Sequence, residues 1–228
     1  MNSIGDIKNV LYINLNKRTD RNAQVLQEFN KFSWIKNPQR FSAVETKNGA
    51  IGCTISHIRC LELAKTMNWD HVIICEDDIK FTNPSLFEQN LNKFLASGVE
   101  WDVILLAGNN VGHYRASHPS RNIDEIFAVK IQACQTTTGY LVKREYYDTL
   151  LNNFKESVDR LIREPRNAST YALDKYWFSL QSRDKWHLIY PLTVTQQANH
   201  SDIEKRVMNY DTLMLTLDKT SWGIPRIG

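Results

Sequence analysis

Three consecutive carboxylates, Glu76, Asp77 and Asp78, directly follow the apolar run of residues 72–75. Such a run, rich in β-branched residues, is typical of a buried strand of an α/β sheet, and these sheets bind ligands at the carboxyl ends of their strands. Three adjacent negative charges are unfavourable unless a cation or a hydrogen-bond network offsets them. Because carboxylate oxygens suit Mg²⁺ and Mn²⁺, a divalent metal site is the leading hypothesis. A solvated acidic turn is the alternative.

Two basic residues, Arg18 and Arg21, lie just beyond another apolar run at residues 10–15. If both runs form parallel strands, the two arginines reach the same sheet edge as the carboxylates. Arginines at a helix N-terminus can hold a diphosphate through forked hydrogen bonds, with the helix dipole assisting. The alternative is that they are surface arginines that pair with Asp20, which is a weak interaction.

A glycine-containing segment at residues 49–57 is the third element that could do chemistry. Gly49 and Gly52 at the start of a helix would let the backbone approach a ligand closely, and the free amides there favour negative charge. His57 follows within two turns of that helix. A lone helical histidine is more often a hydrogen-bonded structural residue, so this alternative stays open.

The elements that position these residues alternate between strands and helices, which predicts a mostly parallel α/β sheet flanked by helices in a single domain. The core is expected at about residues 8–203, with a C-terminal extension at 204–228. The polar segment 108–124 is predicted to be a long loop. The predicted strands are 10–15, 41–44, 72–75, 103–106, 127–131 and 139–142, and the predicted helices are 20–29, 50–67, 84–94, 145–154 and 171–180.

Composition excludes several classes of protein. Hydrophobic residues make up 42% of the 228-residue chain, so it is globular rather than disordered. The net charge of +3 gives no support to a nucleic-acid partner. No run approaches the ~20 apolar residues of a membrane span, and the N-terminus does not look like a signal peptide, so a cytoplasmic protein with reduced thiols is expected.

In their order and spacing, these motifs resemble family 25 glycosyltransferases, which include lipopolysaccharide-modifying sugar transferases and collagen galactosyltransferases. The similarity covers roughly residues 12–203. The resemblance rests on segments 13–21, 49–57, 76–78 and 138–140, on Asp174 within 173–177, and on 191–203.

The resemblance implies a GT-A type nucleotide-sugar-binding fold, a UDP-sugar donor and Mn²⁺ or Mg²⁺. It implies Asp78 as the first metal ligand, with Glu76 and Asp77 as a second ligand and a ribose or donor-sugar contact in either order. In an extended backbone Glu76 and Asp78 would lie on one side and Asp77 on the other. His200 is a candidate further ligand, or else a surface loop histidine. The residues expected to bind the donor are Ile13, Asn14, Arg18, Arg21, Ser56, His57, Glu76 and Asp77.

The reaction implied is transfer of a hexose to a hydroxyl of a glycan, lipopolysaccharide or protein acceptor, with inversion at the anomeric carbon. Asp174 is the candidate catalytic base, and Tyr176 and Trp177 could stack on an acceptor sugar; a helix cap or surface aspartate is the alternative for Asp174. Three other functions stay open. They are a nucleotidyltransferase or phosphohydrolase, a non-catalytic glycan-binding module, and a degenerate family member that acts as a scaffold.

Overall fold

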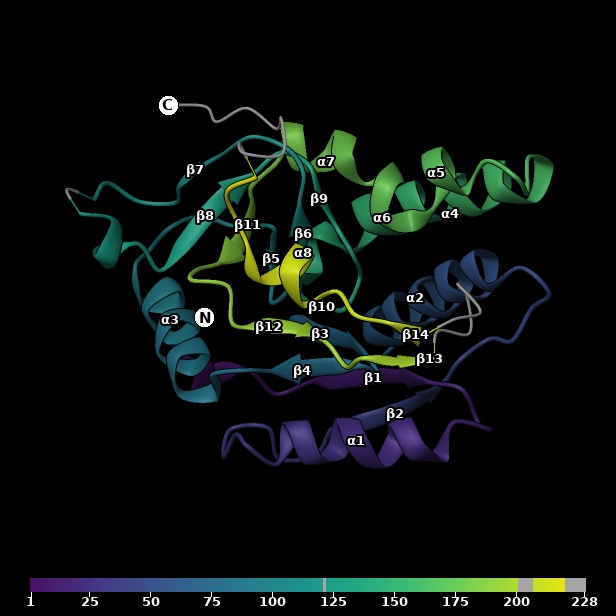
Figure 1. Cartoon of the computed structure of the whole chain (residues 1–228), viewed down its shortest axis with the longest axis horizontal. Helices are drawn as coiled ribbons and strands as arrows, with labels where there is room; N and C mark the ends of the chain where they lie inside the picture. The colour runs from purple at the N-terminus through teal and green to yellow at the C-terminus, as the bar shows by residue number, and fades with distance from the viewer. Residues whose placement is uncertain (121, 201–206, 220–228) are drawn as a thin grey trace.

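The computed structural model describes residues 1–120, 122–200 and 207–219. Its centre is an eight-stranded sheet in the order β2-β1-β3-β10-β5-β11-β8-β7 (Figure 1). The strands of this sheet are β1 (Val10–Asn14), β2 (Gln39–Ser42), β3 (His71–Glu76), β5 (Val103–Leu105), β7 (Tyr114–Ala116), β8 (Ala128–Ile131), β10 (Gly139–Lys143) and β11 (Trp186–Ile189).

Short strands and helices complete the described part of the chain. Three two-stranded pairs lie outside the main sheet: β4 (Ile79–Phe81) with β12 (Val194–Gln196), β6 (Asn109–Asn110) with β9 (Cys134–Gln135), and β13 (Asn199–His200) with β14 (Val207–Met208). The helices are α1 (Thr19–Phe29), α2 (Gly49–Thr66), α3 (Pro84–Ala96), α4 (Tyr147–Arg163), α5 (Ala168–Tyr171), α6 (Leu173–Tyr176), α7 (Phe178–Arg183) and α8 (Asp211–Leu215), with single 3₁₀ turns η1 (Ile4–Asp6), η2 (Ile123–Glu125) and η3 (Arg144–Tyr146).

The predicted α/β class is confirmed, and the sheet is mixed in detail. β1 pairs in parallel with β2 and β3, and β5 pairs in parallel with β11. β10 is antiparallel to both β3 and β5, and β8 is antiparallel to both β11 and β7. Six strands therefore run one way, and β8 and β10 run the other. The parallel pairing of β1 with β3 brings their carboxyl ends to one edge.

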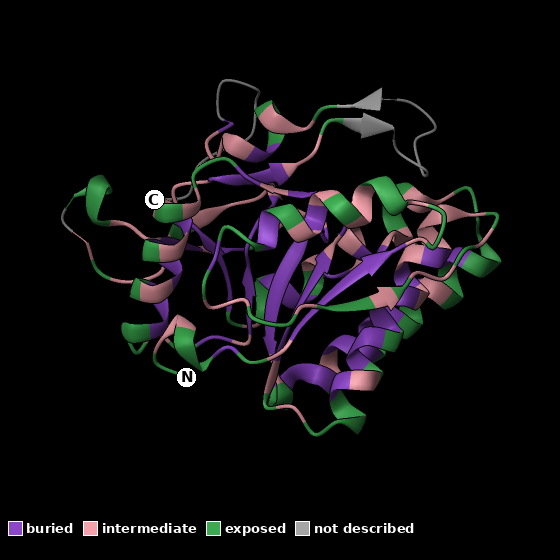
Figure 2. Cartoon of the chain, turned by 90° about the horizontal axis from the view of Figure 1, so that it is seen from below, coloured by how far each residue is buried: buried purple, intermediate pink, exposed green. Residues whose placement is uncertain are grey.

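Each central strand buries alternate side chains on opposite faces of the sheet, as the pleat requires. In β3, for example, Val72 and Ile74 join one core cluster whereas Ile73 and Cys75 join the other. The first cluster is covered by α2, α4 and α6, and the second by α1 and α3. Figure 2 shows the central strands as buried, with exposure concentrated on the outer faces of the helices.

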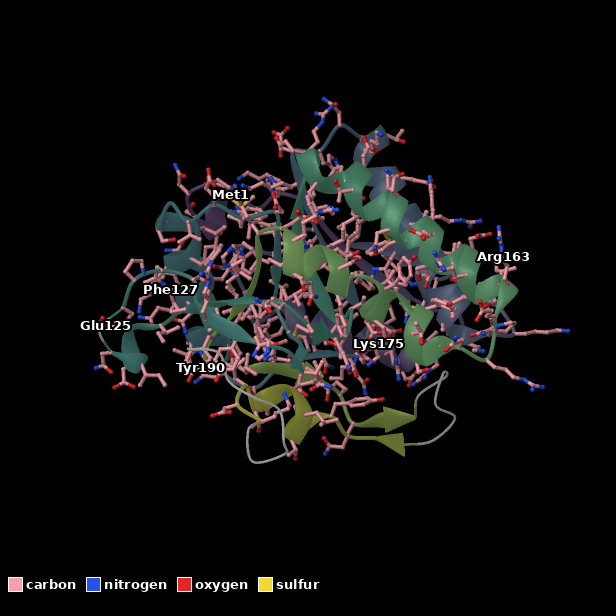
Figure 3. The ribbon with its side chains drawn as sticks, turned by 90° about the horizontal axis from the view of Figure 1, so that it is seen from above. Met1, Glu125, Phe127, Arg163, Lys175 and Tyr190 are labelled. Atoms are coloured by element: carbon pink, nitrogen blue, oxygen red, sulfur yellow. The ribbon has the colours of Figure 1, made fainter. Side chains whose placement is uncertain are left out.

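The six predicted strands and the helices 20–29, 50–67 and 84–94 are confirmed with small shifts in their ends, and helix 145–154 is confirmed but extends to Arg163 as α4. Asn83 caps α3 through the amide of Leu86 with Pro84 in the first turn, because an asparagine oxygen and a fixed proline φ both suit a helix start. The prediction of a long loop at 108–124 is wrong, because β6 and β7 lie within it and η2 begins at its end. Glu125, just beyond it, and Arg163 at the end of α4 lie at opposite sides of the molecule (Figure 3).

The prediction of a single helix at 171–180 is also wrong, because three short helices, α5, α6 and α7, occupy this region. None of the described helices is both long and apolar enough to cross a bilayer.

The packing of α4 leads to a stability prediction. Leu150 is fully buried against the sheet, whereas Ile162 on the same helix is 58% exposed. We expect Leu150→Ala to lower the free energy of unfolding by about 2–5 kcal/mol, because it removes buried methyl groups and leaves a cavity. Ile162→Ala is the matched control and should change it by less than about 0.5 kcal/mol in urea unfolding. Equal effects of the two substitutions would contradict this packing.

Candidate functional site

A cavity of about 600 Å³ lies at the carboxyl ends of β1 and β3. Ile13 and Leu15 of the first strand and its turn line one part, and Glu76 at the end of β3 lines the middle. Residues of α5 and α6, among them Asp174, line the opposite part. The cavity therefore connects the predicted donor residues with the predicted base.

Asp77 and Asp78 form a two-residue turn between β3 and β4, and this turn ends the extended backbone. Both carboxylates approach the same guanidinium nitrogen, since Nη1 of Arg21 lies 3.0 Å from Asp77 Oδ1 and 3.3 Å from Asp78 Oδ2. The side-chain amide of Asn14 donates to the other oxygen of Asp77 over 2.7 Å. The expectation that Glu76 and Asp78 share one side is wrong, because the turn groups Asp78 with Asp77.

Burial dominates the electrostatics of this turn. It raises the pKa of Asp77 above its usual range, although Arg21 and Asn14 act in the opposite direction. Burial and the nearby charge of Glu76 raise the pKa of Asp78 to about 8. Asp78 Oδ1 is buried and has no hydrogen-bond partner among the described residues. Ionising both carboxyls would therefore place more negative charge on the turn than Arg21 neutralises.

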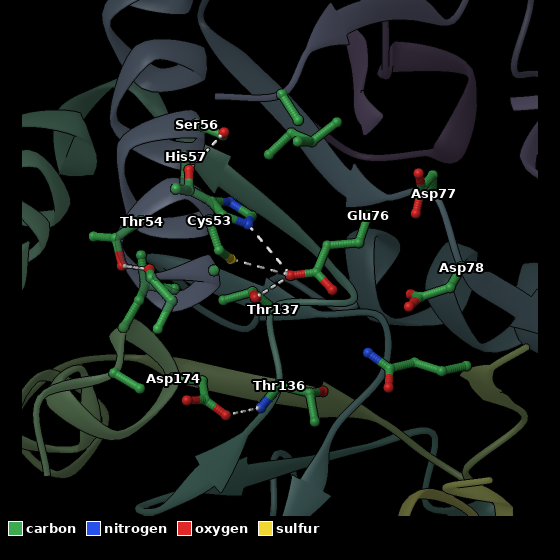
Figure 4. Close-up of a pocket in the computed structure, with 18 of the residues that line it drawn as sticks. Cys53, Thr54, Ser56, His57, Glu76, Asp77, Asp78, Thr136, Thr137 and Asp174 are labelled. Carbon is green, nitrogen blue, oxygen red and sulfur yellow. Dashed lines mark hydrogen bonds and ion pairs between the residues drawn. The ribbon is translucent and has the colours of Figure 1, made fainter. Parts of the chain in front are cut away.

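Glu76 points away from this turn and into a separate group of side chains (Figure 4). Its Oε1 accepts from the hydroxyl of Thr137 over 2.5 Å, and it lies 3.6 Å from both Cys53 Sγ and His57 Nε2. Burial alone would raise the pKa of Glu76, but the contacts with His57, Thr137 and Cys53 outweigh it and hold that pKa below its usual value. Glu76 is thus kept as an anion.

The start of α2 brings His57 and Cys53 to this place. Asn48 caps the helix by accepting from the amide of Ala50. A Cβ at Gly52 would lie 2.4 Å from the carbonyl oxygen of Val44, so only glycine allows this close approach. The hydroxyl of Ser56 accepts from the amide of Val44 over 2.9 Å and donates to the carbonyl of Gly52. Gly52 and Ser56 therefore allow the start of α2 to pack closely against the segment that follows β2.

Asp174 lies in the first turn of α6, on the opposite wall of the cavity. Its Oδ2 accepts from the backbone amide of Thr136 over 3.1 Å, and burial raises its pKa. Thr136 has a φ of 75°, which is costly for a β-branched residue and typical of functional sites. The backbone is thus held in an unfavourable conformation where it meets the predicted base.

The structure brings most of the predicted donor residues together, with Arg18 as an exception. Ile13, Arg21, Ser56 and His57 line the cavity with the carboxylates, and Asn14 adjoins them through Asp77. Arg18 forms an ion pair with Asp20 over 2.8 Å and is absent from the described cavity lining. The side chain of His200 lies outside the described part of the chain, although its backbone pairs with Val207.

The prediction that Trp177 stacks on an acceptor sugar is wrong. Trp177 is fully buried, and its indole nitrogen donates to the carbonyl of Cys134 over 2.9 Å. Tyr176 packs beside Arg160, whose guanidinium carbon lies 5.8 Å from the ring centroid. A buried tryptophan whose indole N–H has a hydrogen-bond partner is a normal core residue.

Sequence reasoning missed several residues that line the cavity. Thr136 and Thr137 precede the segment 138–140 that carried part of the resemblance, and Gln196 and Gln197 fall within the segment 191–203. Tyr210 and Leu213 come from the predicted C-terminal extension, which lacked periodicity. Met214 beside them is fully buried, so this part of the extension packs on the core.

The donor set of the turn fits a hard divalent cation. Asp77 and Asp78 offer carboxylate oxygens at the cavity, which is the ligand type that Mg²⁺ and Mn²⁺ prefer. The unpartnered Asp78 Oδ1 and the raised pKa of its carboxyl are the features that a bound cation would relieve.

Comparison of the folds gives several similar solved structures. One is a glycosyltransferase involved in the glycosylation of the major capsid of PBCV-1, with 12% identity, a TM-score of 0.46, and coverage of 86% of this chain and 95% of that chain. A mutant of the Drosophila β1,4-galactosyltransferase 7, in complex with manganese, UDP-Gal and xylobiose, has 11% identity, a TM-score of 0.44, and coverage of 97% and 81%. A197 from STIV has 14% identity, a TM-score of 0.42, and coverage of 89% and 95%.

No curated protein sequence matches the chain. The family model described as glycosyltransferase family 25 (LPS biosynthesis protein) matches residues 46–164, which is 119 of the 228 residues. This match covers α2, the acidic turn after β3, and the strands up to α4. The chain belongs to glycosyltransferase family 25.

Proposed function

We propose that the enzyme transfers a hexose from a nucleotide-diphosphate sugar, with UDP as the expected nucleotide, to a hydroxyl of a glycan, lipopolysaccharide or protein acceptor. The proposed reaction depends on Mn²⁺ or Mg²⁺ and inverts the anomeric carbon. The observation that carries this proposal is the buried Asp77–Asp78 turn at the cavity, with its unpartnered carboxylate oxygen and raised pKa.

Asp77 and Asp78 would hold the cation, which supplies positive charge to the departing diphosphate. Arg21 contacts both carboxylates and adds a fixed positive charge beside the proposed cation site. Asn14 holds Asp77 in place through its second oxygen. Together these residues make a site that suits a diphosphate and the cation it carries.

Asp174 is the proposed base. Figure 4 shows its carboxylate on a different wall of the cavity from Asp77 and Asp78. An acceptor hydroxyl between the two walls would attack the anomeric carbon from the side opposite the diphosphate. The new bond to the acceptor oxygen forms as the bond to the phosphate oxygen breaks, and the hydroxyl proton passes to Asp174. Inversion requires the base and the leaving group to lie on opposite sides of the anomeric carbon.

A thermal-shift screen of nucleotides and nucleotide sugars, with and without Mn²⁺, tests the donor class directly. UDP compounds should raise the melting temperature more than other nucleotides, and Mn²⁺ should increase that shift. A nucleotide response that is the same with EDTA as with Mn²⁺ would count against the proposed cation site.

Replacing Asp78 tests the metal role. We expect Asp78→Asn to reduce transfer by at least about 100-fold and to weaken Mn²⁺-dependent UDP binding in calorimetry, because a cation ligand is lost. Asp184→Asn is a matched control, since Asp184 pairs with Arg183 and lies outside the described cavity lining. Wild-type turnover in Asp78→Asn at saturating Mn²⁺ would rule out the assigned role.

The raised pKa of Asp78 also predicts a dependence of stability on pH. The carboxyl has a pKa of about 8 in the folded protein and an ordinary value of 3.8. Between these values the folded state holds a proton that the unfolded state releases, so Asp78 makes the metal-free protein less stable as pH rises. In EDTA at pH 8, Asp78→Asn should therefore be more stable than the wild type, by at most about 5 kcal/mol. Urea unfolding should show this gap shrinking toward pH 5; a gap independent of pH would contradict it.

Replacing Asp174 separates base catalysis from donor binding. We expect Asp174→Asn to lower kcat by about 10²–10⁴-fold, because the amide cannot take the acceptor proton. The affinity for UDP with Mn²⁺, measured by calorimetry, should stay close to that of the wild type. An unchanged kcat would remove Asp174 from the reaction.

A further inference from the structure

A second group of possible ligands lies beside the acidic turn. Cys53 and His57 are one helical turn apart on α2, and Glu76 reaches them from the end of β3. Their ligand atoms, Cys53 Sγ, His57 Nε2 and Glu76 Oε1, all lie within 4.8 Å of one another. We refer to these three residues as the Cys–His–Glu trio.

Two of the three distances within the trio are close to those of a tetrahedral metal site. Zinc bonds are about 2.3 Å to sulfur and about 2.0 Å to nitrogen or oxygen, so neighbouring ligand atoms in a tetrahedron are about 3.3–3.5 Å apart. The Sγ of Cys53 and the Nε2 of His57 each lie 3.6 Å from Glu76 Oε1. The third pair, Cys53 Sγ and His57 Nε2, lies within 4.8 Å, so a shift of these two side chains toward each other would bring all three atoms to bonding distance around one ion.

His57 supplies a separate indication of a missing ligand. Its side chain has no solvent exposure, yet its Nε2 has no hydrogen-bond partner among the described residues. Figure 4 shows this nitrogen directed toward Glu76. The other ring nitrogen, Nδ1, lies 3.0 Å from the hydroxyl of Tyr140. Such a contact orients the ring and lets Nδ1 carry the proton, which leaves the lone pair of Nε2 for a metal.

We propose that the Cys–His–Glu trio binds Zn²⁺ at a site separate from the Asp77–Asp78 turn. Sulfur, imidazole and carboxylate together suit zinc, whereas the carboxylate turn suits harder cations. On binding, Cys53 Sγ, His57 Nε2 and Glu76 Oε1 each form a bond to the ion, and the thiol proton passes to solvent. Three protein ligands leave a fourth position open, and all three residues line the cavity, which gives the ion a way in.

A bound zinc ion would tie α2 to β3 and neutralise Glu76. The competing interpretation is a metal-free network, in which the neutral thiol of Cys53 and the ring of His57 only support the anion of Glu76. That interpretation predicts no stoichiometric metal and no metal-dependent change in stability. The two are therefore separable by measurements that do not involve sugar transfer.

Cobalt substitution tests the site in the wild-type protein. The metal-free chain is titrated with Co²⁺ in the absence of nucleotide, and absorption is recorded in the near ultraviolet and visible ranges. We expect a thiolate-to-cobalt charge-transfer band and the visible bands of a tetrahedral ion, both saturating with one Co²⁺ per chain at this site. Zn²⁺ should displace the Co²⁺ and raise the melting temperature. Absence of the charge-transfer band in the folded wild-type protein would overturn the proposal.

Variants then assign the ligands. Cys53→Ala should abolish the charge-transfer band and weaken Zn²⁺ binding by at least about 100-fold, whereas Cys60→Ala, which removes a buried thiol from the same helix, should keep both. Asp78→Asn should also keep Zn²⁺ binding but lose Mn²⁺-dependent UDP binding. The experiments can therefore contradict the zinc site without contradicting the proposed donor site, or the reverse. A band that persists in folded Cys53→Ala would also overturn the assignment.

Discussion

Buried negative charge at the end of β3 is the constraint around which the described site is arranged. Burial strengthens repulsion among Glu76, Asp77 and Asp78, because little water remains to screen it. Three separate segments supply the compensation. The start of α1 brings Arg21 to the two aspartates, α2 brings His57 to Glu76, and the chain before β10 adds the hydroxyl of Thr137.

The turn after β3 divides this charge into two parts with different chemistry. Glu76 is held as an anion by its contacts with His57, Thr137 and Cys53. Asp77 and Asp78 share one guanidinium, and burial raises the pKa of both. A protein that buries carboxyls whose ionisation is unfavourable gives up stability there, which is common where a ligand completes the site. A cation that arrives with the donor would supply the missing charge.

Sequence patterns predicted the frame of the site well, because its strands are local apolar runs. The parallel pairing of β1 with β3 followed from alternating strands and helices, and it placed Arg21 beside the carboxylates. Contacts between distant segments could not be predicted in this way. Nothing in the periodicity of 108–124 indicated that β7 joins the sheet, since three residues are too few for a pattern. Arg18 pairs with Asp20, two residues further along the chain, and this pairing was the alternative interpretation of Arg18 in the sequence analysis.

The segment around Asp174 shows why residue type alone assigns roles poorly. Trp177 was expected to stack on an acceptor, but its burial anchors α6 instead. Its indole holds the carbonyl of Cys134, and the carboxylate of Asp174 holds the amide of Thr136 on the same stretch of chain. These two bonds fix α6 against the strand β9 and the residue that follows it, so the position of Asp174 depends on a packed tryptophan. The aromatic residue thus serves the proposed base by positioning it rather than by touching a sugar.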